Sequence, residues 1–225
     1  MPRFFHPELP NGGETSLPDD EAHHFARVLR GRVGQTVTLF DGHGRSATGE
    51  VVEVGKRSVR VRLGTVETDP PPVAAITVAI APPKGDRFRW AIEKLTELGV
   101  GRVLPIRTAR SVTDPGGTKL DKLRQTSLAA CKQCGRNRLM TIDEPVGLAA
   151  ALAEPAETKW IADRGGQSPP GPATSGLVLV GPEGGWTDDE RDAADVAGCR
   201  PLGLGETILR TETAAIAAAV RLGLA

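Results

Sequence analysis

The 225-residue sequence has few of the features that mark secreted, membrane-spanning or disulfide-stabilised proteins. Its three cysteines, Cys131, Cys134 and Cys199, are too few for a disulfide framework. The sequence shows no charged-then-apolar signal segment and no apolar run long enough to cross a bilayer. We therefore expect a cytoplasmic protein with no membrane partner, long enough to bury a large core without covalent staples.

Net charge and aromatic side chains are also scarce. Lys plus Arg and Asp plus Glu number 28 each, so the zero net charge gives no general electrostatic attraction to nucleic acid. With no tyrosine, three tryptophans and five phenylalanines, the chain is not expected to build a large aromatic platform for stacked bases. Any nucleic-acid surface must therefore be local and must rely mostly on arginine and lysine.

The histidines and cysteines lack the spacing of a metal site. All four histidines lie in the first 43 residues. A zinc site at Cys131-x-x-Cys134 would need two further ligands, and only Cys199 and those remote histidines remain. A redox pair would be expected in a thioredoxin-like context instead. We predict no metal.

The first seventy residues have the short-strand pattern of a small β domain, and a barrel is expected. Strands are predicted over residues 36–40, 48–54 and 58–63, with Gly-containing turn residues after the first. A helix is predicted over residues 19–30, because Phe25, Val28 and Leu29 fall on one helical face.

The run Asp69-Pro70-Pro71-Pro72 breaks both helix and strand and predicts a domain boundary, giving domains 1–70 and 73–225. Strands and helices then alternate, which indicates a mostly parallel α/β sheet with helices on both faces. The Gly-, Pro- and Ser-rich residues 165–176 are expected to form a flexible loop. The predicted elements are strands at 74–80, 102–106 and 177–180 and near Met140 and Trp160, and helices at 86–98, 119–134 and 145–153.

The apolar run at residues 177–180 ends abruptly in Gly-Pro-Glu-Gly-Gly at 181–185, as a buried parallel strand does when it reaches a turn. Thr187 and Glu190 form a capping box, so a helix is predicted to start directly afterwards. Ligands bind at this edge of open α/β sheets, where glycines let them approach the backbone and a helix N-terminus favours electronegative groups. A tight turn with no ligand explains this segment equally well.

A second glycine segment, LGLGETILRTETAAI, begins at residue 202. Together with GPEGG it resembles the two signature segments of the RsmE-type ribosomal RNA uridine-N3 methyltransferases, which belong to the SPOUT class. The opening PRFF and HHFARVLRGRVGQTVTLFDGHG resemble the PUA-like RNA-binding domain of the same family. PKGDRFRWAIEKLTELGV, the triplet Arg110-Ser111-Val112 and CKQCGR resemble further family segments, so the likeness covers nearly the whole chain.

This resemblance implies an N-terminal PUA-like β-barrel and a C-terminal SPOUT domain that threads a deep trefoil knot. It implies S-adenosylmethionine (SAM) as the cofactor, a uridine N3 of small-subunit (16S) ribosomal RNA as the methyl acceptor, and a homodimer. Free ribosomal RNA and the small ribosomal subunit are both possible partners. The residues expected to bind the cofactor are Val180, Gly181, Pro182, Glu183, Gly184, Leu202, Gly203, Leu204, Ile208, Leu209, Arg210 and Thr213.

Charge is patterned locally although the total cancels. Residues 84–110 carry seven cations against three anions, and residues 119–138 carry six against one. An ordinary solvated helix face explains either stretch alone, but the family likeness favours contact with phosphates. The residues expected to bind RNA are Arg3, His24, Arg27, Arg30, Lys84, Arg110 and Arg136.

Methylation of uridine N3 requires a group that removes the imide proton or stabilises the resulting anion. The candidates near the cofactor loops are Glu183, Glu206, Glu212 and Arg210. We name Glu212, near the start of the closing helix expected over residues 213–222, and Arg210, two residues before it, whereas Glu183 could equally orient the loop. A helix cap or a loop-fastening ion pair is an equally good account of each. Trp186, beside the glycine turn, fits either a stacking surface or the core.

Two other functions remain open from the sequence. The first is a non-catalytic RNA-binding protein that keeps a degenerate cofactor fold, and the intact GPEGG and ILRTETA segments argue against it. The second is a Rossmann-type dinucleotide enzyme. Gly203-x-Gly205 lacks that motif's third glycine and its usual early position in the chain.

Overall fold

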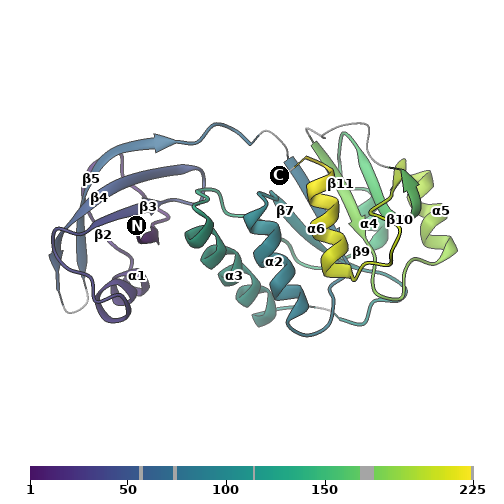
Figure 1. Ribbon diagram of the computed structural model, residues 1–225, viewed down its shortest axis with the longest axis horizontal. Helices are drawn as coiled ribbons and strands as arrows, with labels where there is room; N and C mark the ends of the chain where they lie inside the picture. Colours follow the sequence, from purple (N-terminus) through teal and green to yellow (C-terminus); the bar gives the residue numbers. More distant parts are fainter. Residues whose placement is uncertain (56–57, 73–74, 114, 168–174, 224–225) are drawn as a thin grey trace. The chain divides into compact units, whose positions relative to one another are not determined.

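Two separate β-sheets organise the chain in a computed structural model, which describes residues 1–55, 58–72, 75–113, 115–167 and 175–223 (Figure 1). Each sheet belongs to its own unit. The first unit comprises residues 1–71 and 131–139, and the second comprises residues 72–130 and 140–225. The first division between the units falls between Pro71 and Pro72, within the proline run. Residues 131–139, which we expected in the second domain, belong instead to the first unit.

The first unit is built on a five-stranded mixed sheet with the order β1-β3-β4-β5-β2. Alternating buried and exposed residues in β4 and β5 place Val51, Val59 and Val61 in a core with Phe4 and Phe25. The strands β4 and β5 are longer than predicted because they pair with each other along most of their length. The strands are β1 (Arg3–Phe5), β2 (Gly13–Ser16), β3 (Thr36–Phe40), β4 (Arg45–Val54) and β5 (Val59–Thr68).

The helix predicted over residues 19–30 is shorter and changes type. It comprises α1 (Asp19–His23) followed by a π-helical turn, η1 (His24–Val28). The N–H of Leu29 donates to the carbonyl of His24, five residues back, at 3.0 Å. This wider turn changes the phase of the helix, so Phe25 is buried whereas Val28 and Leu29 are 62% and 44% exposed. The prediction that these three residues share one face is therefore wrong.

Residues 131–139 are fastened to the first unit by side-chain hydrogen bonds. The Asn137 side chain accepts a hydrogen bond from Arg3 and donates to Ser46 Oγ at 3.2 Å and to Asp69 Oδ1 at 3.0 Å. Lys132 forms an ion pair with Glu21, which is only 7% exposed. These contacts join the segment to residues more than 60 positions away, which explains why the sequence did not place it here.

The second unit is an α/β layer structure on a parallel sheet with the order β12-β10-β11-β6-β7-β8, and β9 pairs with β7, as predicted for the fold class. Its strands are β6 (Ala75–Ile80), β7 (Arg102–Arg107), β8 (Thr141–Ile142), β9 (Val146–Gly147), β10 (Lys159–Gln167), β11 (Ser175–Val180) and β12 (Cys199–Leu202). Its helices are α2 (Arg87–Glu97), α3 (Thr118–Cys134, whose last turn lies in the first unit), α4 (Leu148–Leu152), α5 (Asp188–Val196) and α6 (Thr211–Arg221).

The two faces of this sheet carry different helices (Figure 1). Helices α2, α3 and α6 pack over one face around Ile80 and Ile92, and α4 and α5 pack over the other around Leu179. Strand β10 continues through Gln167, so residues 165–167 are not the loop that we predicted. Residues 168–174 of that predicted loop lie outside the described residues. The two glycine motifs lie in the segments that follow the carboxyl ends of β11 and β12.

Candidate functional site

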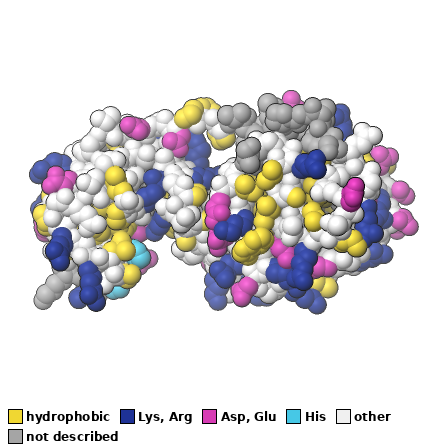
Figure 2. Space-filling model, in the orientation of Figure 1, with side chains coloured by type: hydrophobic (Ala, Val, Ile, Leu, Met, Phe, Trp, Pro, Cys, Tyr) yellow, Lys and Arg dark blue, Asp and Glu magenta, His cyan; other side chains and the backbone are white. Residues whose placement is uncertain are grey.

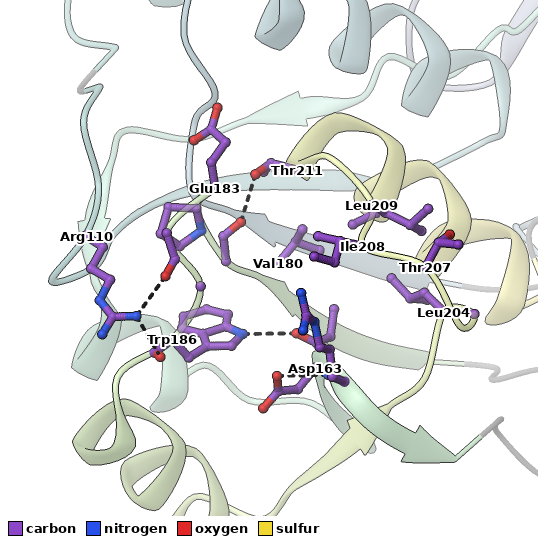
Figure 3. Close-up of a pocket in the computed structure, with 18 of the residues that line it drawn as sticks. Arg110, Asp163, Val180, Glu183, Trp186, Leu204, Thr207, Ile208, Leu209 and Thr211 are labelled. Carbon is purple, nitrogen blue, oxygen red and sulfur yellow. Dashed lines mark hydrogen bonds between the residues drawn. The ribbon is translucent and has the colours of Figure 1, made fainter.

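A cavity of about 370 Å³ lies at the carboxyl ends of β10, β11 and β12 in the second unit (Figure 3). Three separate segments line most of it: residues 162–164 in the middle of β10, the turn after β11, and the loop from β12 into the first turns of α6. Arg110 and Arg191 complete the lining. The two glycine motifs singled out in the sequence therefore form one site.

The Trp186 side chain packs against the turn after β11. This side chain is 3% exposed, and its Nε1–H donates to the carbonyl of Ala162 in β10 at 3.0 Å (Figure 3). A Cβ atom at Gly181 would lie 2.9 Å from Trp186 Cε2, so a glycine is needed for this packing. Of its two possible roles, Trp186 has the core one, although one side of it reaches the cavity.

Arg110 forms hydrogen bonds with backbone carbonyl groups of the same turn. Its Nη1 donates to the carbonyl oxygens of Gly184 at 2.7 Å and Trp186 at 3.3 Å (Figure 3). A Cβ at Gly184 would approach the Arg110 side chain to 3.2 Å, so the arginine lies close along the turn. Arg110, which we predicted to bind RNA, thus lines the cavity and holds the shape of the turn.

Two carboxylates at the cavity are each paired with an arginine. Glu183 in the turn lies 3.3 Å from Arg87 Nη1 of α2. Asp163 in β10 accepts from Arg191 Nε at 2.6 Å and from the Arg164 N–H at 2.9 Å. The Asp163 carboxylate raises the pKa of Arg191. The Asp163–Arg191 pair was not predictable from the sequence, because its members come from a strand and a helix 28 positions apart.

The loop between β12 and α6 brings aliphatic side chains to the cavity. Leu204, Ile208 and Leu209 line it, and Ile208 is 75% exposed. Thr211 then begins α6, and its Oγ1–H donates to the carbonyl of Gly181 at 3.1 Å (Figure 3). This bond joins the second glycine segment directly to the first.

The structure brings together most of the residues predicted to bind the cofactor. Val180, Gly181, Pro182, Glu183, Gly184, Leu204, Ile208 and Leu209 line the cavity. Leu202, Gly203, Arg210 and Thr213 are not among its lining residues. Leu202 is fully buried in the core. Gly203 donates its N–H to the Gln167 carbonyl at 3.1 Å, and a Cβ there would lie 2.0 Å from the Gly166 oxygen, so close strand packing requires this glycine.

The two predicted catalytic residues have contrasting surroundings. Glu212 is 6% exposed, and its Oε2 has no hydrogen-bond partner among the described residues. It lies in the first turn of α6, one and two turns before Ala215 and Ala219, which pack in the core with α2. Arg210 is exposed and immediately precedes α6. Neither side chain lines the cavity, although Leu209 and Thr211 beside them do.

The residues predicted to bind RNA are distributed over both units. His24, Arg27, Arg30 and Lys84 are exposed. Arg3 has contacts within its own unit: it donates a hydrogen bond to Asn137, and its guanidinium carbon lies 5.1 Å from the centre of the Phe40 ring. Burial lowers the pKa of both Arg3 and Arg136.

Within the described ranges, no three His, Cys, Asp or Glu side chains gather closely enough to hold a metal ion. In the same part of the chain, every helix is too short or too polar to cross a membrane.

Comparison with known proteins gives concordant results for both units. Residues 69–223 match a model described as an RNA methyltransferase domain, and residues 17–64 match one described as an RNA methyltransferase PUA domain. The chain is 34% identical to the ribosomal RNA small subunit methyltransferase E of Mycobacterium bovis, covering 98% of this chain and 90% of that protein.

Solved structures agree. A ribosomal RNA small subunit methyltransferase E from Neisseria gonorrhoeae, bound to SAM, has a TM-score of 0.88 at 34% identity, covering 98% of this chain and 95% of that one. A methyltransferase from Legionella pneumophila with bound SAM has a TM-score of 0.87 at 30% identity, covering 98% and 96%.

Proposed function

Because this chain belongs to the RNA methyltransferase family that includes the ribosomal RNA small subunit methyltransferases E, we propose that it transfers a methyl group from SAM to N3 of a uridine in small-subunit ribosomal RNA. The observation that carries the proposal is the cavity, because both glycine segments of the sequence meet there and Thr211 joins them.

The residues of the cavity fit SAM. Its volume of about 370 Å³ is in the range of small-molecule sites. Val180, Leu204, Ile208 and Leu209 offer aliphatic contacts for the apolar part of a nucleoside, while the paired carboxylates and arginines at the edge suit a zwitterionic amino-acid group. When bound, SAM supplies an electrophilic methyl group on a sulfonium. The protein's task is then to hold donor and acceptor in line and exclude water.

The Thr211 hydrogen bond gives a test of the cavity. Thr211→Val keeps the shape of the side chain but removes the donor to the Gly181 carbonyl, so the two glycine segments lose their direct link. We expect the Kd for SAM, measured by calorimetry, to rise about five- to tenfold. Thr158→Val is the matched control, because Thr158 makes an equivalent bond to the Ser175 carbonyl at 2.9 Å away from the cavity. Equal SAM affinity in both variants would show that the Thr211 bond does not shape the site.

We propose that Glu212 or Arg210 handles the charge that develops at N3. Uridine N3 carries a proton at neutral pH, so transfer needs either a base or a cation that stabilises the anion on O2 and O4. The unpartnered oxygen of Glu212 supports the first role, since buried carboxylate oxygens in native proteins normally have partners. The exposure of Arg210 next to the cavity-lining Leu209 supports the second role.

We also propose that RNA contacts the first unit through His24, Arg27 and Arg30. The further proposed contacts are Arg3 and Arg136 of the first unit and Lys84 and Arg110 of the second. Arg27→Ala and Arg30→Ala should each reduce the slope of log affinity against log salt concentration by about one, because each removes one phosphate contact. The control is Arg60→Ala, since Arg60 lies in the same unit but is paired with Glu53. SAM affinity should not change. An unaltered slope in both test variants would exclude this face from the RNA interface.

The protein is proposed to act in the cytoplasm as a homodimer on ribosomal RNA or the small subunit, and its C-terminal segment to thread a trefoil knot. Support for threading comes from the path of the chain. After the edge strand β12, the chain reaches the turn that follows β11, where Thr211 bonds to Gly181. Helix α6 then packs on α2 and on β6, a strand in the middle of the sheet.

Support for a dimer comes from apolar side chains exposed around α6: Ile208 is 75% and Val220 44% exposed. Light scattering measures the oligomeric state directly.

Product identification tests the whole proposal. Small-subunit ribosomal RNA from a strain lacking the gene is incubated with the protein and SAM, then digested with nuclease and analysed by mass spectrometry. The expected product is N3-methyluridine at one position, formed at a rate insensitive to chelators and thiol reagents. A methyl group on carbon 5 or on ribose would overturn the proposal. No SAM binding by calorimetry would favour a non-catalytic RNA-binding protein.

A further inference from the structure

Residues 27–33, hereafter the wedge loop, present an unusual mixture of side chains to solvent. Arg27, Arg30 and Arg32 are exposed, and none of them forms an ion pair within the described residues. Val28, Leu29 and Val33 are 62%, 44% and 61% exposed. No acidic residue occurs in the loop itself. Hydrophobic and basic side chains, with the neighbouring histidines, gather over α1 on the face shown in Figure 2.

The first half of the wedge loop is held in a defined conformation. The Gly31 N–H donates to the Phe25 carbonyl at 2.9 Å. Gly31 also packs directly on the buried Phe25 ring, since a Cβ there would lie 2.1 Å from Cζ. Between them, Arg30 has φ 51°, and it is the only non-glycine residue with positive φ in the described part of the chain. A left-handed residue followed by an N–H that bonds a carbonyl six residues back is a Schellman-type ending of a π-helical turn, so the end of the helix fixes the backbone at Arg30.

The second half is fixed to the sheet. The Gln35 side chain accepts from the Arg32 N–H at 3.3 Å, and the Gln35 N–H donates to the Arg32 carbonyl at 3.2 Å. Gly34 donates to the Val51 carbonyl in β4 at 2.8 Å. With both ends fixed, the loop holds its aliphatic side chains outward instead of letting them fold back onto the core. Little ordering entropy is then lost when they contact a partner.

We propose that the wedge loop binds an unpaired segment of RNA, with Val28 and Leu29 inserted between unstacked nucleotides and Arg27, Arg30 and Arg32 on the flanking phosphates. Cations alone would serve for phosphate contacts, whereas rigid exposed aliphatic side chains add an apolar surface that unstacked bases can cover. A-form duplex gives such side chains no access to its bases through the deep, narrow major groove. The inference rests on the proposed function and narrows its substrate to a loop or bulge.

Binding is measured by fluorescence titration without SAM, using an RNA hairpin with a uridine-containing loop that carries 2-aminopurine, and a fully paired duplex of equal length. Leu29→Ser and Val28→Ser keep every charge, so the salt slope should stay unchanged while hairpin affinity falls about tenfold. Duplex affinity should not change. The increase in 2-aminopurine emission on binding should be lost in both variants. Val196→Ser is the matched control, because Val196 is 90% exposed in the other unit.

The proposal for the wedge loop would be wrong if the Leu29→Ser and Val28→Ser variants lost equal affinity for hairpin and duplex. It would also be wrong if their hairpin affinity and the 2-aminopurine emission were both unchanged. Binding to phosphatidylglycerol vesicles that is lost in Leu29→Ser, while hairpin binding is kept, would assign the loop to anionic lipid and also overturn it. The melting temperature of each variant shows that the fold is intact. Methylation of ribosomal RNA by the wild-type protein would continue to support the proposed function even if the wedge fails, so the two failures are distinguishable.

Discussion

Replacing Glu212 with glutamine is expected to lower the single-turnover rate of methyl transfer by roughly 100-fold or more, the usual scale for losing a general base. The substitution keeps the size of a side chain that is only 6% exposed and removes its ability to accept a proton. SAM affinity should survive, because Glu212 does not line the cavity. Rapid-quench kinetics with saturating SAM and substrate RNA measure the rate.

The matched control is Glu206→Gln, since Glu206 is an exposed carboxylate in the loop before α6 and is not among the cavity residues. If Arg210 stabilises the uridine anion instead, Arg210→Met should shift the pH dependence of the rate upward, because the ionisation of the substrate then receives less help. A Glu212→Gln rate within a few fold of wild type, together with an unshifted profile for Arg210→Met, would exclude both residues from the proton step.

Gly203→Ala is expected to destabilise the second unit by about 3 kcal/mol, at the upper end of ordinary overpacking. The added Cβ would lie 2.0 Å from the Gly166 oxygen, and that oxygen belongs to the backbone of β10, which cannot rotate away as a side chain can. The melting temperature should fall by roughly 6–12 °C in a chain of this length. Differential scanning calorimetry gives both quantities.

Gly116→Ala is the control, because Gly116 is not among the glycines with positive φ and a Cβ there would meet nothing within 4 Å. Its stability should stay within about 0.5 kcal/mol of wild type. The sequence led us to expect Gly203 in the cofactor pocket, and the two placements make different predictions. A Gly203→Ala protein with an unchanged melting temperature and no SAM binding would return Gly203 to the cofactor site.

The parts of the site predicted from sequence are those with local signals. The turn at residues 181–185 followed a buried strand, and the capping box of Thr187 and Glu190 is present as predicted, with the Thr187 side chain accepting from the Glu190 N–H at 3.2 Å. Such features depend on residues a few positions apart. The parallel sheet was likewise predicted, because the order of strands and helices restricts its topology.

The features that the sequence did not reveal depend on distant partners. Arg110 reaches a turn 74 positions away, and in the sequence it was one more cation in a basic stretch. Phe25 in the π-helical turn η1 packs against Phe4, with ring centres 5.7 Å apart, and helix periodicity alone assumes an α-helix and does not predict this contact. Tertiary packing determines both features, and a single sequence carries no sign of that packing.

Residues 131–139 make the first unit discontinuous along the gene. A fragment that ended at the proline run would lack Asn137. The half-buried Arg3 would then lose its hydrogen bond to the Asn137 side chain, and Asp69 would lose the hydrogen bond that Asn137 donates to it. Such a fragment is therefore not expected to fold stably when it is fused to another protein. Recombination at the proline run would separate residues that belong to the same folded unit. We therefore expect the first unit and helix α3 to be inherited together, although the proline run at residues 70–72 marks the division between the two units.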